Sequence, residues 1–348
     1  MASIIEILIP IWERVLDRSP IAADDNFFEL GGDSLLALKL FAEISTVLGN
    51  DLAPVILYQA PTIATLAALL ERPHTLRFPT LTELKPGTTE PPLFVTHGIG
   101  GNVMDFFQVV KYIETSQPVY GMQSKGVSGV EEPFKRVEDM AQYFLEAMKE
   151  RQPRGPYYLV GYSLGGLVML ELAQRLVDRG DKVGLLAMLE AYPHRMYLPP
   201  TEHLRLILRR AKRHAKILIG LSPKEAISYI LHPADRVAFV PRNGNPRRDG
   251  LPLEAWFTLP VQRMRDHAYF GLRNYKPRYY PGKIKFIRAE TITEFPANPA
   301  AVWSRLAKEI EVTTVSGDHL EIMNTHFKSV GTVLSRYLEE ALRDARVS

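Results

Sequence analysis

The spacing of apolar residues divides this chain into two unlike parts. Up to about residue 72 the apolar positions recur at helical spacing, beginning with the stripe Ile4, Leu8, Ile11 and Val15. Pro10 lies inside that stripe and should bend the first helix or delay its start. Further helices are predicted from Ser34, over residues 54–58 and over residues 62–70, so this part should fold as a small bundle of four helices.

Beyond about residue 91 the pattern changes to short apolar runs that alternate with amphipathic stretches. The apolar runs predict strands near residues 93–96, 119–122, 158–160, 184–189, 283–288 and 312–315. The amphipathic stretches predict helices near residues 137–151, 164–178, 300–308 and 326–343. Such alternation predicts an α/β domain with a mainly parallel sheet and helices on both of its faces.

The same pattern gives the expected boundaries. Residues 73–90 contain several prolines and have no clear period, which favours an extended linker. We therefore expect a helical domain at residues 1–72, a linker at 73–90 and an α/β domain at 91–348. Within the α/β domain, residues 195–280 interrupt the alternation and begin with an amphipathic helix rich in Lys and Arg.

Charge separates the two parts further. Residues 1–72 hold four Lys or Arg and ten Asp or Glu, which gives a net charge of −6. Residues 195–248 hold twelve Lys or Arg and three Asp or Glu, which gives a net charge of +9. We expect the acidic helical domain to be attracted to this basic insertion. The simpler interpretation of the basic helix is a solvated face, and a helix that lies on a membrane surface is a further alternative.

Composition limits the available chemistry. The 348 residues include no cysteine, which excludes disulfides, thiolate metal sites and a cysteine nucleophile. The apolar N-terminus lacks a preceding basic region, so no signal peptide is expected, and no apolar run is long enough to span a bilayer. We therefore expect a cytoplasmic protein with no metal site and no nucleic-acid or membrane partner.

A candidate nucleophile stands at the junction of a predicted strand and a predicted helix. The segment 161–165 reads Gly-Tyr-Ser-Leu-Gly and places Ser163 on the turn between them. Glycines two residues before and two residues after the serine suit a strained turn that exposes its hydroxyl. An ordinary flexible turn is the alternative, but the flanking strand and helix favour a nucleophile.

Further residues can complete a serine-hydrolase site. His319 follows the last predicted strand in a glycine-containing loop, where it can act as the general base. The amides of Ile99 and Leu164 can form an oxyanion hole, because the glycine-rich run 97–101 lets the backbone turn close to the serine. For the acid that orients the histidine, Glu190 and Glu290 each end a strand after the serine, and both remain open.

The helical domain carries a second serine of interest. Gly31 and Gly32 close a loop that leaves Ser34 exposed at the start of a helix, whose first amides favour a phosphate. The simpler interpretation is that Asp33 and Ser34 only cap that helix.

These motifs resemble known families. The run Asn-Phe-Phe-Glu-Leu-Gly-Gly-Asp-Ser-Leu-Leu at 26–36 resembles the attachment loop of peptidyl carrier domains in nonribosomal peptide synthetases, in which the serine that corresponds to Ser34 carries 4′-phosphopantetheine. The α/β domain resembles the type I thioesterase domains that end such synthetases, which implies a helical lid over residues 195–280. In that family the acid usually lies in Asp-x-Tyr-Pro. This chain has Glu-Ala-Tyr-Pro at 190–193, so the resemblance favours Glu190.

The resemblance implies a carrier and thioesterase didomain. It would release an acyl or peptidyl chain from the pantetheine on Ser34 through an acyl-enzyme on Ser163, by hydrolysis or cyclisation. Its partners would be the thioester substrate, upstream synthetase modules and a phosphopantetheinyl transferase. A proofreading hydrolase that serves other carriers and a scaffold without catalysis are the alternatives, and the presence of Ser163 with His319 argues against the scaffold.

Overall fold

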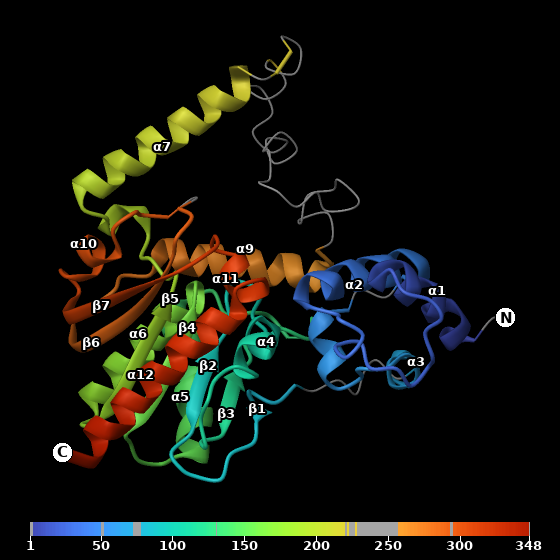
Figure 1. Cartoon of the computed structure of the whole chain (residues 1–348), viewed down its shortest axis with the longest axis horizontal. Helices are drawn as coiled ribbons and strands as arrows, with labels where there is room; N and C mark the ends of the chain where they lie inside the picture. The colour runs from blue at the N-terminus through green and yellow to red at the C-terminus, as the bar shows by residue number, and fades with distance from the viewer. Residues whose placement is uncertain are drawn as a thin grey trace.

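The computed structural model shows a helical module followed by a larger α/β module (Figure 1). The structure describes residues 3–49, 52–71, 78–129, 131–219, 221–222, 227, 257–292 and 295–347. Parts of the expected linker and much of the expected lid, residues 223–226 and 228–256, therefore lie outside the described residues.

The helical module forms around one apolar core. It contains α1 (Ile4–Leu16), α2 (Ser34–Leu48), the 3₁₀ helix η1 (Pro54–Tyr58) and α3 (Ile63–Leu70). Its core includes the fully buried side chains of Trp12, Phe27 and Phe41. The first helix begins at Ile4 despite Pro10, because Ser3 and Glu6 form a reciprocal cap that satisfies its first amides.

The α/β module is built on one seven-stranded sheet in the order β1-β3-β2-β4-β5-β6-β7. All neighbouring strands are parallel except β1, which pairs antiparallel with β3. This arrangement confirms the predicted mainly parallel sheet. The strands are β1 (Leu81–Lys85), β2 (Leu93–Thr96), β3 (Val119–Met122), β4 (Tyr157–Tyr162), β5 (Val183–Leu189), β6 (Tyr280–Ala289) and β7 (Ala307–Val315).

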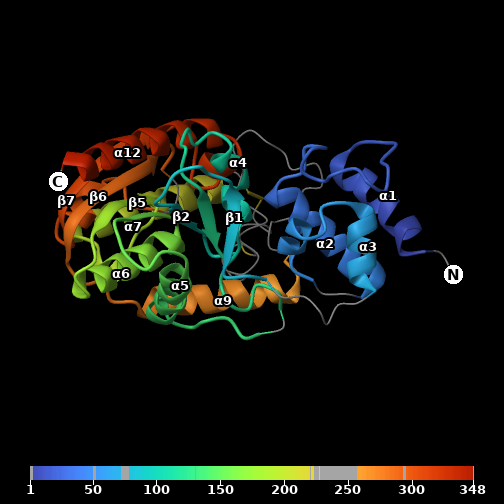
Figure 2. The same ribbon diagram turned by 90° about the horizontal axis from the view of Figure 1, so that it is seen from below.

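Helices cover both faces of the sheet, as predicted. α5 (Val137–Arg151) and α6 (Leu164–Asp178) lie on one face, and α4 (Phe107–Val110) and α12 (Phe327–Val347) on the other (Figure 2). Strand β4 supplies both cores alternately, because Leu159 packs toward α6 whereas Tyr158 and Val160 pack toward α12. The ends of β4, β5 and β7 meet at one edge of the sheet, where the site is expected.

Two predictions of secondary structure differ from the structure. The region 73–90, expected as a linker, contains β1, an edge strand with no fully buried side chain. The helix expected at 300–308 is shorter, since α10 covers Pro299–Trp303 and β7 begins at Ala307. β1 and β7 are the two edge strands of the sheet. Each buries few side chains, so the apolar pattern that would predict a strand is weak.

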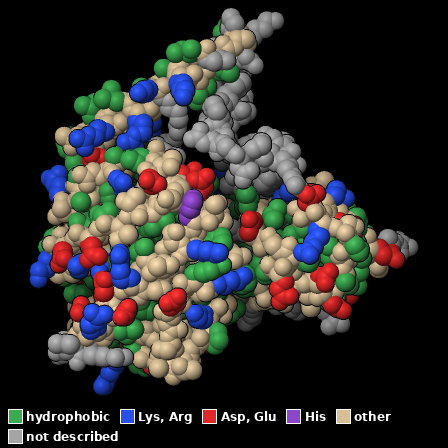
Figure 3. All heavy atoms as spheres, in the orientation of Figure 1, with side chains coloured by type: hydrophobic (Ala, Val, Ile, Leu, Met, Phe, Trp, Pro, Cys, Tyr) green, Lys and Arg blue, Asp and Glu red, His purple; other side chains and the backbone are tan. Residues whose placement is uncertain are grey.

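The described part of the insertion contains the long helices α7 (Pro200–Ile219) and α9 (Leu259–Asn274), after the short η4 (Arg195–Tyr197). Lys and Arg side chains gather along α7, whereas Asp and Glu side chains are spread over the helical module (Figure 3). Leu204, Leu208 and Ile219 on α7 are more than half exposed. In the part of the chain that the structure describes, no helix is long and apolar enough to cross a membrane.

The helical module packs on the α/β module through apolar side chains. The Phe28 and Phe107 ring centroids lie 4.5 Å apart, and the Tyr58 ring meets Phe107 edge-on at 5.6 Å. Met104 is 5% exposed and belongs to the apolar core of the helical module. The Thr258 hydroxyl, at the start of α9, donates to the Leu52 carbonyl at 3.1 Å. None of these contacts involves the basic helix α7, and the expected attraction between the acidic helical module and the basic insertion stays a prediction.

Candidate active site

Ser163 occupies a strained turn between β4 and α6. Its backbone has φ 54° and ψ −119°, a conformation that non-glycine residues rarely adopt. The Ser163 amide donates to the Leu189 carbonyl at 2.8 Å, which ties the turn to β5. A Cβ at Gly161 would come within 2.3 Å of the Gly165 oxygen, and one at Gly165 within 2.2 Å of the His97 oxygen. Only glycine fits at these two positions, as the sequence pattern predicts.

His319 lies in the loop after β7, beside this turn. Its ring stacks on Tyr162 with centroids 5.1 Å apart, and Phe295 lies 4.4 Å away. The Tyr162 hydroxyl donates to the His319 carbonyl at 2.8 Å, so the residue before Ser163 also holds the histidine loop. Asp318 accepts the amides of Leu320 and Glu321, which fixes the other side of the loop.

Of the two candidate acids, Glu190 lies beside the histidine. Its Oε2 is 3.6 Å from His319 Nδ1, and its Oε1 accepts the Ala289 amide at 2.9 Å. Glu190 is 4% exposed, whereas Glu290 is exposed after the end of β6. The separation of 3.6 Å is longer than a hydrogen bond, and His319 Nδ1 has no hydrogen-bond partner among the described residues. Such contacts commonly shorten when substrate binds.

The loop after β2 runs close to Ser163 and contains Ile99. Leu164, the other residue expected in the oxyanion hole, is the first residue of α6. The Gly98 amide donates to Asp105 Oδ2 at 3.0 Å, and the Asn102 side-chain amide donates to the Gly100 carbonyl at 3.3 Å. Sequence reasoning missed Asp105 and Asn102, although Asn102 has the signature of a helix cap before η3 (Val103–Phe106).

Burial shifts the pKa values of two titratable groups, one at the start of this loop and one on η3. His97 is 1% exposed, and burial lowers its pKa to about 4. Its Nδ1 lies 2.7 Å from the Gly98 carbonyl, so the neutral ring carries its proton on that nitrogen. Burial also raises the pKa of Asp105 to about 6, while the Gly98 amide and the charge of His319 oppose that rise.

Ser34 is the first residue of the 15-residue helix α2. Asp33 caps the helix, with Oδ1 accepting the amides of Leu35 at 2.9 Å and Leu36 at 2.8 Å. Gly32 packs against Phe27, where a Cβ would approach the ring within 2.3 Å. These contacts hold the start of α2 in a defined position.

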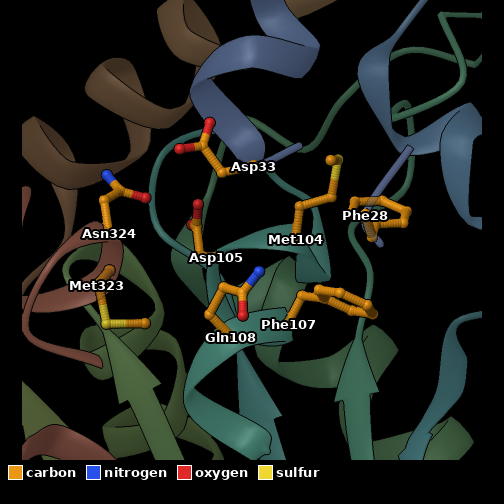
Figure 4. A pocket seen from close by; sticks show the side chains of 8 residues that line it. All are labelled: Phe28, Asp33, Met104, Asp105, Phe107, Gln108, Met323 and Asn324. Atoms are coloured by element: carbon orange, nitrogen blue, oxygen red, sulfur yellow. The ribbon is translucent and has the colours of Figure 1, made fainter. Parts of the chain in front are cut away.

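A narrow pocket lies between the start of α2 and the α/β module (Figure 4). Asp33 faces Asp105 across it, with Phe28, Met104 and Phe107 to one side and Met323 and Asn324 to the other. Met323 and Asn324 belong to α11 (Glu321–Asn324), which directly follows the His319 loop. Its cavity volume of about 10 Å³ is roughly enough for one water molecule, which is too small for a pantetheine arm.

Comparison with known proteins assigns both modules. Residues 6–70 match the phosphopantetheine attachment site family, which indicates a covalently attached 4′-phosphopantetheine, and residues 91–205 match the thioesterase domain family. The chain is 32% identical over 346 residues to a dimodular nonribosomal peptide synthase of Bacillus subtilis (strain 168), covering 96% of this chain and 14% of that protein. It is 29% identical over 317 residues to enterobactin synthase component F of Escherichia coli (strain K12), covering 90% of this chain and 23% of that protein.

Solved structures agree on the fold. A four-domain nonribosomal peptide synthetase, holo-AB3403, aligns over 97% of this chain and 26% of its own, with a TM-score of 0.58 and 23% identity. The type II thioesterase BorB from the borrelidin biosynthetic cluster aligns over 74% of this chain and 97% of its own, with a TM-score of 0.51 and 19% identity. The chain is therefore a carrier and thioesterase didomain, a phosphopantetheine attachment domain followed by a thioesterase domain of the α/β-hydrolase fold.

Proposed function

We propose that this didomain releases an acyl or peptidyl chain from its own carrier, with Ser163 as nucleophile, His319 as general base and Glu190 as the acid that orients the histidine. The observation that carries the proposal is the 3.6 Å approach of Glu190 Oε2 to His319 Nδ1 beside the strained turn of Ser163. In this proposal residues 1–72 form the carrier, and the thioesterase extends from β1, which belongs to its sheet, to residue 348, with a lid over 195–280.

Ser34 is the attachment residue in this proposal. When bound there, 4′-phosphopantetheine supplies a flexible arm whose terminal thiol holds the acyl chain as a thioester. The arm would extend from the start of α2, where Asp33 faces the α/β module. A phosphopantetheinyl transferase would attach it, and upstream synthetase modules would supply the acyl chain.

The chemistry follows that of serine hydrolases. Ser163 Oγ attacks the acyl carbonyl while His319 Nε2 takes the hydroxyl proton, and the tetrahedral oxyanion accepts hydrogen bonds from the amides of Ile99 and Leu164. Each such donor contributes about 3 kcal/mol in the transition state. The thiol leaves with the proton from His319, and an acyl ester remains on Ser163. Water or a nucleophile within the acyl chain then gives its proton to His319 and takes the acyl group, so Ser163 is restored.

Packing of the carrier beside the site favours release from the same chain over proofreading of other carriers. The Phe28 and Phe107 contact joins the two domains, and Asp33, next to Ser34, lines the same pocket as Met323 and Asn324 near the His319 loop.

Intact mass spectrometry tests this function. The protein is treated with a phosphopantetheinyl transferase and an acyl-coenzyme A, and the acyl mass is followed over time. We expect Ser34→Ala to gain no mass, Ser45→Ala on the same helix to load normally, and Ser163→Ala to load but retain the acyl group. A mass gain that persists in Ser34→Ala contradicts the attachment site. Release by Ser163→Ala at the wild-type rate contradicts the nucleophile.

A mixing experiment separates the two modes of release. The Ser34→Ala protein, which has an active thioesterase, is mixed at equal concentration with acyl-loaded Ser163→Ala protein. We expect much slower release than in the wild-type chain, because a tethered carrier has a high effective concentration. Equal rates would favour the proofreading alternative.

A further inference from the structure

Asp105 is a carboxylate next to the active site that the mechanism above does not use. It belongs to the one-turn helix η3, which follows the loop that contains Ile99. In the pocket view its carboxylate points up toward Asp33, away from Gln108 (Figure 4). Burying a carboxylate is unfavourable unless it is paired or hydrogen-bonded, so its position needs a reason.

Within the described part of the chain, Asp105 accepts a hydrogen bond from the backbone of the proposed oxyanion loop. Asp105 Oδ2 accepts the Gly98 amide at 3.0 Å, and Gly98 directly precedes Ile99. The other side of the Gly98 backbone faces Tyr162, since a Cβ there would lie 3.1 Å from the ring carbon Cε1. The peptide between His97 and Gly98 is therefore held by Asp105, and the His97 oxygen rests against Gly165.

The hydrogen bond from the Gly98 amide to Asp105 restricts the direction of the Ile99 amide. A peptide group is planar, so an anchored Gly98 amide restricts the rotation that aims the Ile99 amide. Asn102 restrains the far end of the loop by donating to the Gly100 carbonyl and accepting the Met104 amide at 2.9 Å. An oxyanion hole depends on donors that are already oriented before the reaction.

We propose that Asp105 is a positioning residue for the release reaction: it holds the Gly98 amide so that the Ile99 amide faces the oxyanion. This inference rests on the proposed function, because the role requires acyl transfer at Ser163. The carrier reaches the same turn, since Met104 and Phe107 on either side of Asp105 contact the helical module.

The test uses an acyl N-acetylcysteamine thioester, a small soluble substrate that needs no carrier, with the full chain. Asp105→Asn keeps an acceptor oxygen for the Gly98 amide but removes the charge. Asp105→Ala removes both. Asp139→Asn, an exposed residue in the first turn of α5, is the matched control.

We expect Asp105→Ala to lower kcat about tenfold or more with little change in KM, because loss of an oriented oxyanion donor acts on the transition state. Asp105→Asn should restore kcat to within about threefold of wild type. Asp139→Asn should match wild type in both measurements.

The outcomes separate this inference from the proposed function. A kcat of Asp105→Ala equal to that of Asp139→Asn overturns the loop role, and so does a kcat of Asp105→Asn as low as that of Asp105→Ala. If Asp105→Ala does not fold, as judged by circular dichroism, Asp105→Leu, which fills a similar space without an acceptor oxygen, is measured in its place. Failure of the proposed function looks different, because wild type and Ser163→Ala would then hydrolyse the thioester equally slowly.

Discussion

The protein should lose stability as the pH falls because His97 is buried, and replacing His97 by asparagine should make the stability depend less on pH. The His97 pKa is lowered from 6.5 to about 4 by burial, so the ring stays neutral in the folded protein while the unfolded chain takes up a proton. The stabilising effect of the neutral ring is therefore fully present above pH 6.5 and disappears as the pH approaches 4.

The magnitude follows from the two pKa values. The interval from 6.5 to about 4, at 1.36 kcal/mol for each pH unit, corresponds to about 3 kcal/mol, of which roughly 2 kcal/mol is lost between pH 7 and pH 4.5. Asparagine can still donate to the Gly98 carbonyl, but it does not titrate and fills less space. The variant should thus be less stable at pH 7 by about 1–2 kcal/mol and approach wild type at pH 4.5.

The assay is urea unfolding followed by circular dichroism at several pH values from 7 to 4.5. Val95→Ala is the control, because it removes buried methyl groups two residues earlier on β2 and keeps the histidine. Its free energy of unfolding should lie below that of wild type by a constant amount at every pH. If His97→Asn loses stability toward acid as steeply as Val95→Ala does, the buried neutral histidine is not the cause and the reasoning is refuted.

Three further predictions concern the acid, the turn and the carrier contact. In single-turnover deacylation, Glu190→Gln should be slower by about 10⁴ and Glu290→Gln close to wild type; the reverse result would move the acid to the later strand. Gly165→Ala should lower the free energy of unfolding by at least about 3 kcal/mol, because its Cβ would lie 2.2 Å from a backbone oxygen. Gly180→Ala, which has open space at φ +79°, should cost about 1 kcal/mol, and equal melting temperatures for the two would contradict this packing. Phe107→Ala should slow release from the tethered carrier more than it slows hydrolysis of a small thioester, and the rate of release should depend little on salt. A strong salt effect on that rate would instead support electrostatic docking of the carrier.

The central part of the fold could be predicted from the sequence because its strands are continuous apolar runs. β2 and β4 are buried along their whole length, and their runs are bounded by turns. β1 and the first half of β7 could not be predicted, because edge strands carry many polar side chains that resemble linker or helix sequence. The reciprocal cap formed by Ser3 and Glu6 lets the first helix begin at Ile4 despite Pro10. Residue-by-residue helix propensities do not show this effect.

The candidate site was predictable where the chemistry depends on a local motif. The glycines around Ser163 identify the turn, and the last strand identifies His319. Glu190 and Glu290 end adjacent parallel strands, so their spacing alone cannot show which carboxylate faces the histidine. Asp105 was missed because its importance depends on a hydrogen bond to a loop that folds back on it.

The backbone at two proposed triad members has a consequence for engineering. Ser163 and Glu190 have φ values of 54° and 46°, in a region that costs a non-glycine residue about 1–3 kcal/mol. The protein therefore gives up part of its folding free energy at the two positions where reactivity depends on geometry. A screen that ranks variants by melting temperature alone would favour glycine at both positions and enrich inactive proteins. Thermostable variants of this enzyme should instead be sought at sites remote from these turns, and each should be retained only if it still turns over substrate.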